Sequence, residues 1–254
     1  DESVRHAITK LAHIHFPATK RAATFLEKMG EQKKQIHLTG CPAIDLLTNI
    51  DLSLPNDIFT QNKGVGPNLN ESMAYIIVLQ HPVTTEFGEG GNQIIETLEA
   101  IKEFTEYHHI QVVWLWPNVD AGSDDISKIL RRFRETENSS SIHFYKNFSP
   151  EDYARLLANC KMIVGNSSSG LREGAYLGIP CVNIGSRQND RERSDNVKDA
   201  SHNRKDILEK MNDRLKEKRY SKSIMFGDGT AGKKMVEILE KKDLTIKKRL
   251  NYLE

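Results

Sequence analysis

The sequence lacks an excess of charge of either sign. Lysine and arginine total 36 and aspartate and glutamate total 35, so the formal net charge is only +1. Proteins that are drawn to nucleic acid or to a membrane surface by their overall field carry a strong excess of basic residues. The balance argues against both partners and favours a small ligand that is bound at one local site.

Cysteine is scarce and scattered. Cys41, Cys160 and Cys181 are odd in number, and none belongs to a CxxC pair. A disulfide framework or a zinc site needs paired or regularly spaced cysteines, so we expect neither, and we expect a reducing cytoplasmic compartment. The sequence shows no clustered carboxylates and no set of histidine and cysteine ligands. We therefore expect no bound metal and no cofactor.

Long apolar runs are also missing. No run approaches the ~20 residues that span a bilayer, and the opening DESVRHAITK lacks the layout of a signal peptide. A soluble protein is expected. The opening instead predicts a helix with an apolar face of Val4, Ile8 and Leu11. Because this pattern starts at Asp1 and without a Met, we expect the chain to begin within a domain.

The first half of the pattern predicts a small βαβ unit followed by a linker. Strands are predicted at residues 11–19 and 35–40, with a helix at 20–30 between them. Residues 51–70 contain prolines and glycines without a sustained period, as irregular connections do. A domain boundary is therefore expected in this segment.

After residue 70 strands and helices alternate regularly. Strands are predicted at 74–82, 110–118, 141–147, 161–166 and 179–186, and helices at 92–108, 123–137, 149–160 and 169–178. Continuous apolar runs such as YIIVL and QVVWLW are typical of strands that are covered on both faces. The fold class is therefore α/β with a doubly wound, parallel, Rossmann-like sheet. A basic helical tail is expected from about residue 207.

Three serines stand between a predicted strand and a predicted helix in the run IVGNSSSGLREGAYLGIP. Ligands of open parallel sheets bind at the carboxyl ends of strands, and backbone N–H groups at a helix start bind anions. We interpret Ser167, Ser168 and Gly170 as a phosphate-binding loop, with a simple helix cap as the alternative. Glu173 would then hold a ribose diol, or be an ordinary first-turn acid.

The motifs LQHPVTTE, PNVDAGS, VGNSSSGLREGAYLGIPCVNIGSRQNDRER and the opening DESVRHAITKLAHIHF resemble, in this order, those of the hydrolysing UDP-N-acetylglucosamine 2-epimerases of sialic acid synthesis. The resemblance implies a glycosyltransferase-B architecture with an active site between two Rossmann-like domains. Residues 1–50 would be the end of the first domain, 51–70 the linker, 71–225 the UDP-binding domain and 226–254 helices that pack back toward the first domain. Part of the first domain would lie outside this sequence, and a homo-oligomer, a dimer or tetramer, is expected.

The resemblance assigns the UDP-binding residues. Ser167 and Ser168 would bind the diphosphate, and Arg187 would help to neutralise it. Glu173 would hold the ribose. Phe148 would pack near the uracil, although an aromatic residue at a strand end is otherwise a core residue.

The resemblance also assigns the residues that act at the sugar. His81 would lie near the diphosphate and the reacting sugar, and Glu2, with Arg5 beside it, would be one of the acids at the sugar. From the residues alone, a histidine at a strand end such as His81 is more often structural than catalytic, and Glu2 would be a solvated first-turn acid. Arg191 and Arg193 are alternatives to Arg187 as the phosphate ligand.

The implied reaction converts UDP-GlcNAc and water to N-acetylmannosamine and UDP. A base removes the C2 proton while UDP leaves C1, and water adds to the resulting glycal. Most of the carboxylates for proton transfer would lie outside this sequence, so the segment alone is expected to bind UDP without turnover. A UDP-sugar-dependent glycosyltransferase of the same fold and a non-catalytic nucleotide-sugar-binding module are the alternatives. The sugar is GlcNAc or a diacetamido relative.

Overall fold

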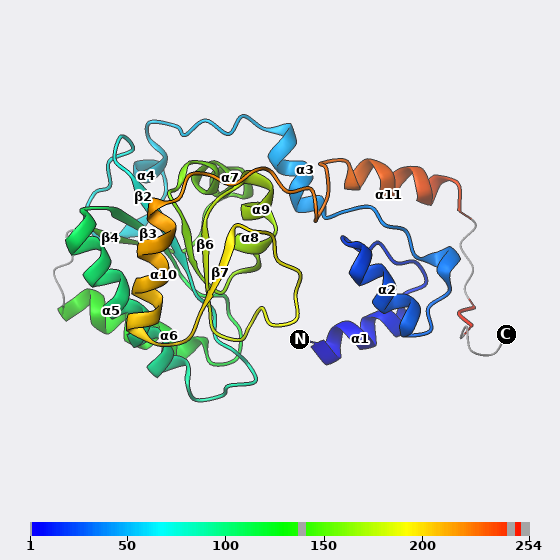
Figure 1. Cartoon of the computed structure of the whole chain (residues 1–254), viewed down its shortest axis with the longest axis horizontal. Helices are drawn as coiled ribbons and strands as arrows, with labels where there is room; N and C mark the ends of the chain where they lie inside the picture. The colour runs from blue at the N-terminus through cyan, green and yellow to red at the C-terminus, as the bar shows by residue number, and fades with distance from the viewer. Residues whose placement is uncertain (1, 137–140, 243–246, 250–254) are drawn as a thin grey trace. The chain divides into compact units, whose positions relative to one another are not determined.

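The computed structural model describes residues 2–136, 141–242 and 247–249, except for the side chain of Glu2. The chain divides into two compact units (Figure 1). Unit 1 comprises residues 1–50 and 224–254, and unit 2 comprises residues 51–223.

Unit 2 is built on a seven-stranded sheet within the described residues. Its strands are β1 (Gly64–Val65), β2 (Tyr75–Leu79), β3 (Gln111–Leu115), β4 (Ile142–Tyr145), β5 (Ile163–Gly165), β6 (Cys181–Ile184) and β7 (Val197–Ala200). The spatial order is β1-β4-β3-β2-β5-β6-β7, and only β1 is antiparallel to its neighbour. The parallel sheet and the strands predicted around β2 to β6 are confirmed, whereas the edge strands β1 and β7 were not predicted.

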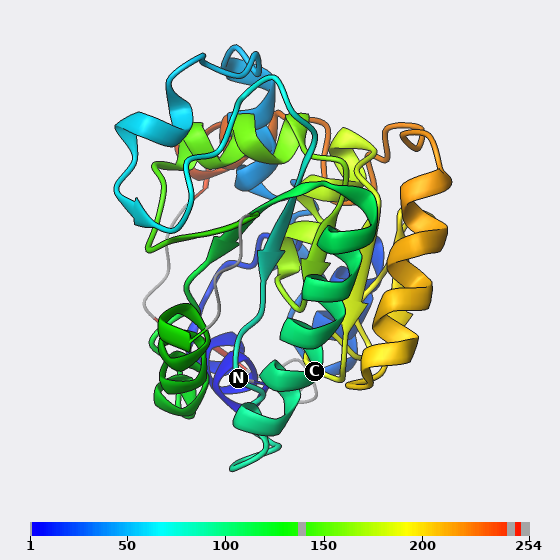
Figure 2. The same cartoon turned by 90° about the vertical axis from the view of Figure 1, so that its left-hand side faces the viewer.

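Helices cover both faces of this sheet. They are α4 (Ile58–Gln61), α5 (Gly90–His108), α6 (Ser123–Thr136), α7 (Pro150–Asn159), α8 (Ser168–Leu171), α9 (Glu173–Leu177) and α10 (Arg204–Lys216). Alternate residues of β2 enter two separate cores: Ile76 and Val78 pack with residues of α5, α6 and α10, and Tyr75 and Ile77 pack with residues of α4, α7 and α8. Helices α5 and α10 lie side by side on the first face (Figure 2). The apolar runs in the sequence therefore have the expected cause, burial on both faces.

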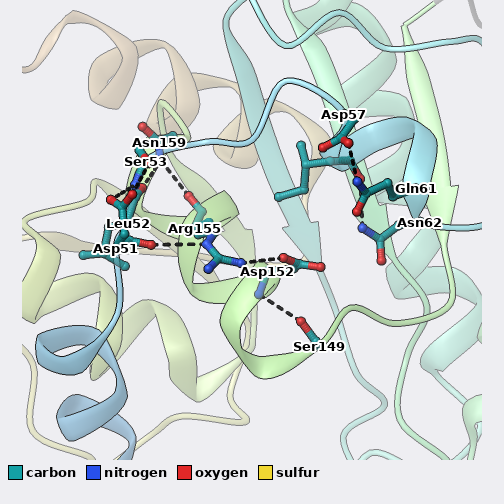
Figure 3. Close-up of polar contacts among 11 residues, drawn as sticks. Asp51, Leu52, Ser53, Asp57, Gln61, Asn62, Ser149, Asp152, Arg155 and Asn159 are labelled. Carbon is teal, nitrogen blue, oxygen red and sulfur yellow. Dashed lines mark hydrogen bonds and ion pairs between the residues drawn. The ribbon is translucent and has the colours of Figure 1, made fainter.

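The segment expected as a linker, residues 51–70, is an ordered part of unit 2. It contains α4 and β1, and Ile58 and Phe59 are buried in the second core. Its first residues are fastened to α7, where Arg155 donates to the carbonyl of Asp51 at 3.2 Å and Asn159 donates to that of Leu52 at 2.8 Å (Figure 3). Although this segment has no regular sequence period, side-chain contacts with residues about 100 positions away hold its first residues in place.

Unit 1 contains short helices and no described strand beyond an isolated bridge. Its elements are α1 (Glu2–Leu11), α2 (Lys20–Lys28), the 3-10 helix η1 (Lys33–Gln35), α3 (Pro42–Asn49) and α11 (Ala231–Glu240). The helix predicted at 20–30 is confirmed as α2. The two predicted strands are wrong, because residues 11–19 and 35–40 form only the single parallel bridge His15↔Ile36. The predicted apolar face of α1 is exposed, with Ile8 at 57%.

Polar contacts hold the distant parts of unit 1 together. Asp45 of α3 accepts hydrogen bonds from the backbone N–H groups of Ala231 at 3.0 Å and Gly232 at 2.7 Å, and so caps the first turn of α11. The buried carboxylate of Glu31 pairs with His15 at 3.0 Å and with Lys248 at 2.6 Å. Helix α11 and Lys248 therefore contact elements from the first 50 residues.

The tail is less helical than expected. Helix α10 ends at Lys216 and α11 begins at Ala231, with an irregular segment between them. None of the helices in the described ranges combines the length and the apolar character needed to cross a membrane.

Candidate nucleotide-binding site

The sheet changes direction between β2 and β5. From β2 the chain proceeds outward through β3 to β4, whereas from β5 it proceeds outward on the other side through β6 to β7. In doubly wound sheets ligands bind at such a switch point, beside the carboxyl ends of the strands. His81 follows β2 closely, and Ser167 follows β5. The fold therefore places two sequence-predicted site residues at the expected position.

The serine loop begins at a position that requires glycine. Gly165, the last residue of β5, has φ 129°, and a Cβ there would lie 2.1 Å from the carbonyl oxygen of Leu79. Ser167 then caps α8, its Oγ accepting from the N–H of Ser169 at 3.3 Å. Ser167 and Ser168 are half-buried, whereas Ser169 is buried and its Oγ lies 2.6 Å from the hydroxyl of Tyr153. Ser167 and Ser169 thus have structural contacts within the loop, and Ser167 and Ser168 remain partly exposed.

The helix expected after the serines is two short helices. Helix α8 ends at Leu171 and α9 begins at Glu173, with Arg172 between them. A long helix dipole is therefore absent here, and hydroxyl and backbone N–H groups are the main donors for an anion. Gly170 is buried, and a Cβ there would lie 2.5 Å from Sγ of Cys181, so this glycine lets α8 pack closely against β6.

His81 is held in one protonation state. It is buried, with an exposed fraction of 4%, and its Nδ1 accepts a hydrogen bond from the backbone N–H of Asn118 at 3.1 Å. An accepting Nδ1 carries no proton, so the neutral ring carries its proton on Nε2. Burial first, and the charge of Arg187 second, lower the pKa of His81 to about 4, against a smaller opposite effect of Asp120. At neutral pH His81 is a hydrogen-bond donor rather than a cation.

Arg187 lies near the serine loop and His81, where it contacts Asn166 and Asp120. Its Nη1 donates to the backbone carbonyl of Asn166 at 3.3 Å, and its Nη2 lies 3.6 Å from Oδ2 of Asp120. Arg193 instead pairs with Asp199 of β7 at 3.1 Å. Of these two, Arg187 is the one that lies beside Asn166 and Asp120, and the choice of phosphate ligand among Arg187, Arg191 and Arg193 stays a prediction.

Glu173 lies beside the serine loop with part of its carboxylate unused. Burial raises the pKa of Glu173, and the neighbouring charge of Arg172 lowers it less. Arg172 Nε is 3.5 Å from Oε2 of Glu173, an ion pair without hydrogen-bond geometry, and Oε2 is buried with no hydrogen-bond partner among the described residues. This oxygen can accept a hydrogen bond from a ligand.

Phe148 is a core residue. Only 6% of it is exposed, and its ring centroid lies 4.7 Å from that of Tyr145. The predicted contact with uracil would therefore involve the edge of a buried ring. Glu2 and Arg5 begin α1 of unit 1, and the side chain of Glu2 lies outside the described residues, so the roles of both stay predictions.

Residues 1–240 match the family model of UDP-N-acetylglucosamine 2-epimerase. The chain belongs to this epimerase family. The UDP-N,N'-diacetylbacillosamine 2-epimerase (hydrolyzing) of Legionella pneumophila is 32% identical over 240 residues, which are 94% of this chain and 60% of that protein. The UDP-N-acetylglucosamine 2-epimerase of Neisseria meningitidis is 30% identical over 217 residues, 82% of this chain and 52% of that protein. The chain thus spans between half and two thirds of the length of these relatives.

Solved structures of the epimerase family share the fold. The crystal structure of the Methanocaldococcus jannaschii UDP-GlcNAc 2-epimerase in complex with UDP-GlcNAc and UDP matches 91% of this chain and 62% of that chain, with a TM-score of 0.71 at 16% identity. The predicted fold class, an α/β Rossmann-like sheet of glycosyltransferase-B type, is confirmed. Among the residues described in this epimerase-family chain, no group of three or more His, Cys, Asp or Glu side chains could hold a metal ion.

Sequence reasoning missed several residues that build the site of this family member. Asn166 and Gln188 are fully buried and join loops, Asp120 pairs with Arg187, and Tyr153 orders the serine loop. All but Tyr153 stand inside the quoted motifs, and Asn166 and Gln188 are direct neighbours of the assigned residues Ser167 and Arg187. Their positions at strand ends were the available signal, because that is where the loops of a parallel sheet converge.

Proposed function

We propose that unit 2 binds UDP at the switch point between β2 and β5, and that the protein is a hydrolysing UDP-N-acetylglucosamine 2-epimerase. The observation that carries the proposal is the convergence of Ser167, His81 and Arg187 on the carboxyl ends of adjacent strands, linked through Asn166. Membership of the epimerase family and the UDP and UDP-GlcNAc in the M. jannaschii complex support it.

The diphosphate of UDP binds at the serine loop. The hydroxyls and the backbone N–H groups of Ser167 and Ser168 donate to its oxygens, and the Arg187 guanidinium neutralises part of its charge. Gly170 contributes by letting α8 approach β6, which fixes where these N–H groups lie. Because Asp120 already lies 3.6 Å from Arg187, the guanidinium stays oriented when the ligand is absent.

The nucleoside extends from the serine loop toward Glu173 and Phe148. Oε2 of Glu173, which lacks a hydrogen-bond partner among the described residues, accepts from a ribose hydroxyl, and this bond favours the charged carboxylate that burial disfavours. The small exposed part of Phe148, 6% of the residue, contributes an apolar contact for the uracil. The ligand thus donates a hydrogen bond to a buried oxygen whose contact within the protein is the ion pair with Arg172.

The reaction is an elimination followed by hydration. A base takes the proton from C2 of the sugar, the C1–O bond breaks, and UDP leaves with the electron pair, giving a glycal. Water then adds across the double bond and releases the 2-epimer, N-acetylmannosamine. Charge develops on the β-phosphate as UDP leaves, so donors aimed there, including Nε2–H of His81, stabilise the transition state more than the ground state.

The sugar is N-acetylglucosamine in this proposal, and a diacetamido sugar is the second candidate. The L. pneumophila relative is named for UDP-N,N'-diacetylbacillosamine and the N. meningitidis relative for UDP-N-acetylglucosamine, at similar identity. Membership of the epimerase family favours epimerisation over glycosyl transfer. Incubation of the protein in its full natural length with each UDP-sugar, followed by assays of free UDP and of the released sugar, separates these possibilities.

Binding is tested on the 254-residue chain by calorimetric titration with UDP. Replacing Ser167 and Ser168 together by Ala should weaken binding by about 1 to 3 kcal/mol, the scale of lost charge-assisted hydrogen bonds. Ser201, whose N–H and Oγ donate to Asp206 in an exposed segment, provides the control, and Ser201→Ala should leave the affinity unchanged. A folded double variant with wild-type affinity for UDP would rule out the serine loop as the phosphate site.

A further inference from the structure

A buried side-chain amide continues the pairing of two strands. The parallel register of β2 and β5 ends at Leu79↔Gly165, and the N–H of Asn166 donates to the carbonyl of Leu79 at 3.1 Å. Beyond this point Oδ1 of Asn166 accepts from the N–H of His81 at 2.7 Å, and its Nδ2 donates to the carbonyl of His81 at 2.8 Å. Since an amide side chain offers the same donor and acceptor as a peptide group, Asn166 supplies one further rung to the sheet.

The backbone of the same residue holds a third strand end. The carbonyl of Asn166 accepts from Nε2 of Gln188 at 2.8 Å and from Nη1 of Arg187 at 3.3 Å, both in the loop after β6. Asn166 and Gln188 each have an exposed fraction of 0%. One residue therefore connects the histidine, the serine loop and the arginine.

His81 is fixed at its main chain by Asn166 and at its ring by Asn118. Asn166 holds the main chain of His81 on both its N–H and its C=O side, and Asn118 holds Nδ1 of the ring at 3.1 Å. With the main chain and one ring nitrogen fixed, the direction of Nε2–H is determined. If the amide were lost, the main chain of His81 could shift, and the bond from Asn118 would lose its geometry.

We infer that Asn166 is a positioning residue for the reaction, which acts by holding His81 in register with the serine loop and Arg187. The inference rests on the proposed function, because it assigns His81 a task during departure of UDP. It predicts that the side chain of Asn166 matters for turnover more than for UDP binding, since Ser167, Ser168 and Arg187 remain in place without it.

Asn166→Ala and Asn183→Ala form a matched pair. Asn183 lies on β6, in register with Gly165, is also 0% exposed, and donates to Asp199 at 2.7 Å. Both changes remove one buried amide, so both should lower the melting temperature. Only the first removes contacts to His81.

Two measurements separate positioning from stability. In the full-length protein, Asn166→Ala should lower kcat by about 10- to 100-fold, the scale of a small misplacement of a reacting group, with KM changed much less. Asn183→Ala should keep wild-type kcat per folded molecule. In the 254-residue chain, NMR of the His81 ring nitrogens should show one neutral tautomer with its proton on Nε2 in the wild type and in Asn183→Ala, and a mixture in Asn166→Ala.

Asn166→Asp gives a second variant of nearly the same volume. Its ionised carboxylate would face the carbonyl of His81 without a donor, whereas its protonated form restores both a donor and an acceptor. The ratio of its kcat to that of the wild type should therefore rise as the pH falls. His81, Asp120 and Arg187 face this position and are present in both proteins, so the comparison isolates the carboxyl group at position 166.

The outcomes distinguish the inference from the proposed function. A wild-type protein that releases no UDP from any UDP-sugar refutes the proposed function, and the NMR comparison still decides whether Asn166 positions His81. If the wild type turns over and Asn166→Ala matches Asn183→Ala in kcat and in the His81 signals, the positioning role is refuted while the function stands. If the ratio of the Asn166→Asp kcat to the wild-type kcat does not change with pH in a folded variant, this also counts against the positioning role of Asn166.

Discussion

Acidification should destabilise unit 2 through His81. The folded pKa of His81 is about 4, against an ordinary value of 6.5. Between these two values the unfolded chain binds a proton that the folded chain does not, so stability rises with pH in this window. The stability that the neutral His81 contributes to the folded state is fully present above about pH 6.5 and is lost as the pH falls toward the folded pKa of about 4.

The size of the effect follows from the shift. At 1.36 kcal/mol for each pKa unit, the change from 6.5 to about 4 corresponds to roughly 3 kcal/mol in full, of which about 2 kcal/mol is lost between pH 7 and pH 5. His81→Asn removes the titration, while the amide oxygen of Asn can still accept from the N–H of Asn118. The variant should therefore lose about 2 kcal/mol less than the wild type on going from pH 7 to pH 5.

Urea unfolding followed by tryptophan fluorescence measures this difference. Trp114 and Trp116 are the two tryptophans of the chain, and both lie in unit 2, so the signal reports on the unit that contains His81. His202 also has a lowered pKa from burial, but it is present in both proteins and cancels in the comparison. Equal losses of stability in the two proteins would show that His81 is not a buried neutral histidine.

Two further predictions concern charges at the proposed site. Arg187→Ala should weaken UDP binding about 10-fold or more, as expected for the loss of one charge-assisted contact. Arg193→Ala, which removes the pair with Asp199, should change the affinity little. Calorimetric titration of both variants measures the two affinities, and a larger loss in Arg193→Ala would contradict the assignment. Glu2→Gln in the full-length protein should lower kcat by about 100-fold or more, on the scale of a lost acid or base, with UDP affinity unchanged, and an assay of released UDP that finds wild-type turnover would remove Glu2 from the mechanism.

The sheet of unit 2 could be predicted because burial on both faces leaves a strong mark in sequence. The run from Tyr75 to Leu79 is apolar at every position, since its alternate residues enter two cores. Strand β7 escaped notice because Lys198 and Asp199, in its middle, are exposed at the sheet edge. An edge strand such as β7 forms because its backbone pairs with that of the neighbouring strand β6, and the local sequence pattern does not show this pairing.

The two strands predicted in unit 1 are wrong because a local sequence pattern suggested strands that have no neighbouring strands among the described residues. Residues 11–19 alternate apolar and polar side chains around His13 and His15, as a strand does, but a strand needs neighbours to pair with. The described residues offer only the bridge between His15 and Ile36. The side chain of His15 serves instead as a partner for the buried carboxylate of Glu31.

The site was only partly predictable. The serines and His81 stand in recognisable motifs, so their meeting at one edge of the sheet follows from strand order. The role of Asn166 does not, because its amide binds a main chain 85 positions away. The break of the helix at Arg172 was missed as well, since residues 169–178 carry no proline to mark it.

The geometry of His81 also limits the chemistry that it can perform. Its Nδ1 lone pair is engaged by the N–H of Asn118, its Nε2 carries the proton, and its pKa of about 4 makes the neutral ring a weak base. A base for the C2 proton needs a free lone pair and a pKa nearer the working pH. In the proposed reaction His81 therefore assists the leaving group, and the base is a different residue. The hydrogen bonds that make His81 a well-aimed donor are the same ones that disqualify it as the base. In this proposal the base is a carboxylate such as Glu2, and residues of unit 2 bind UDP.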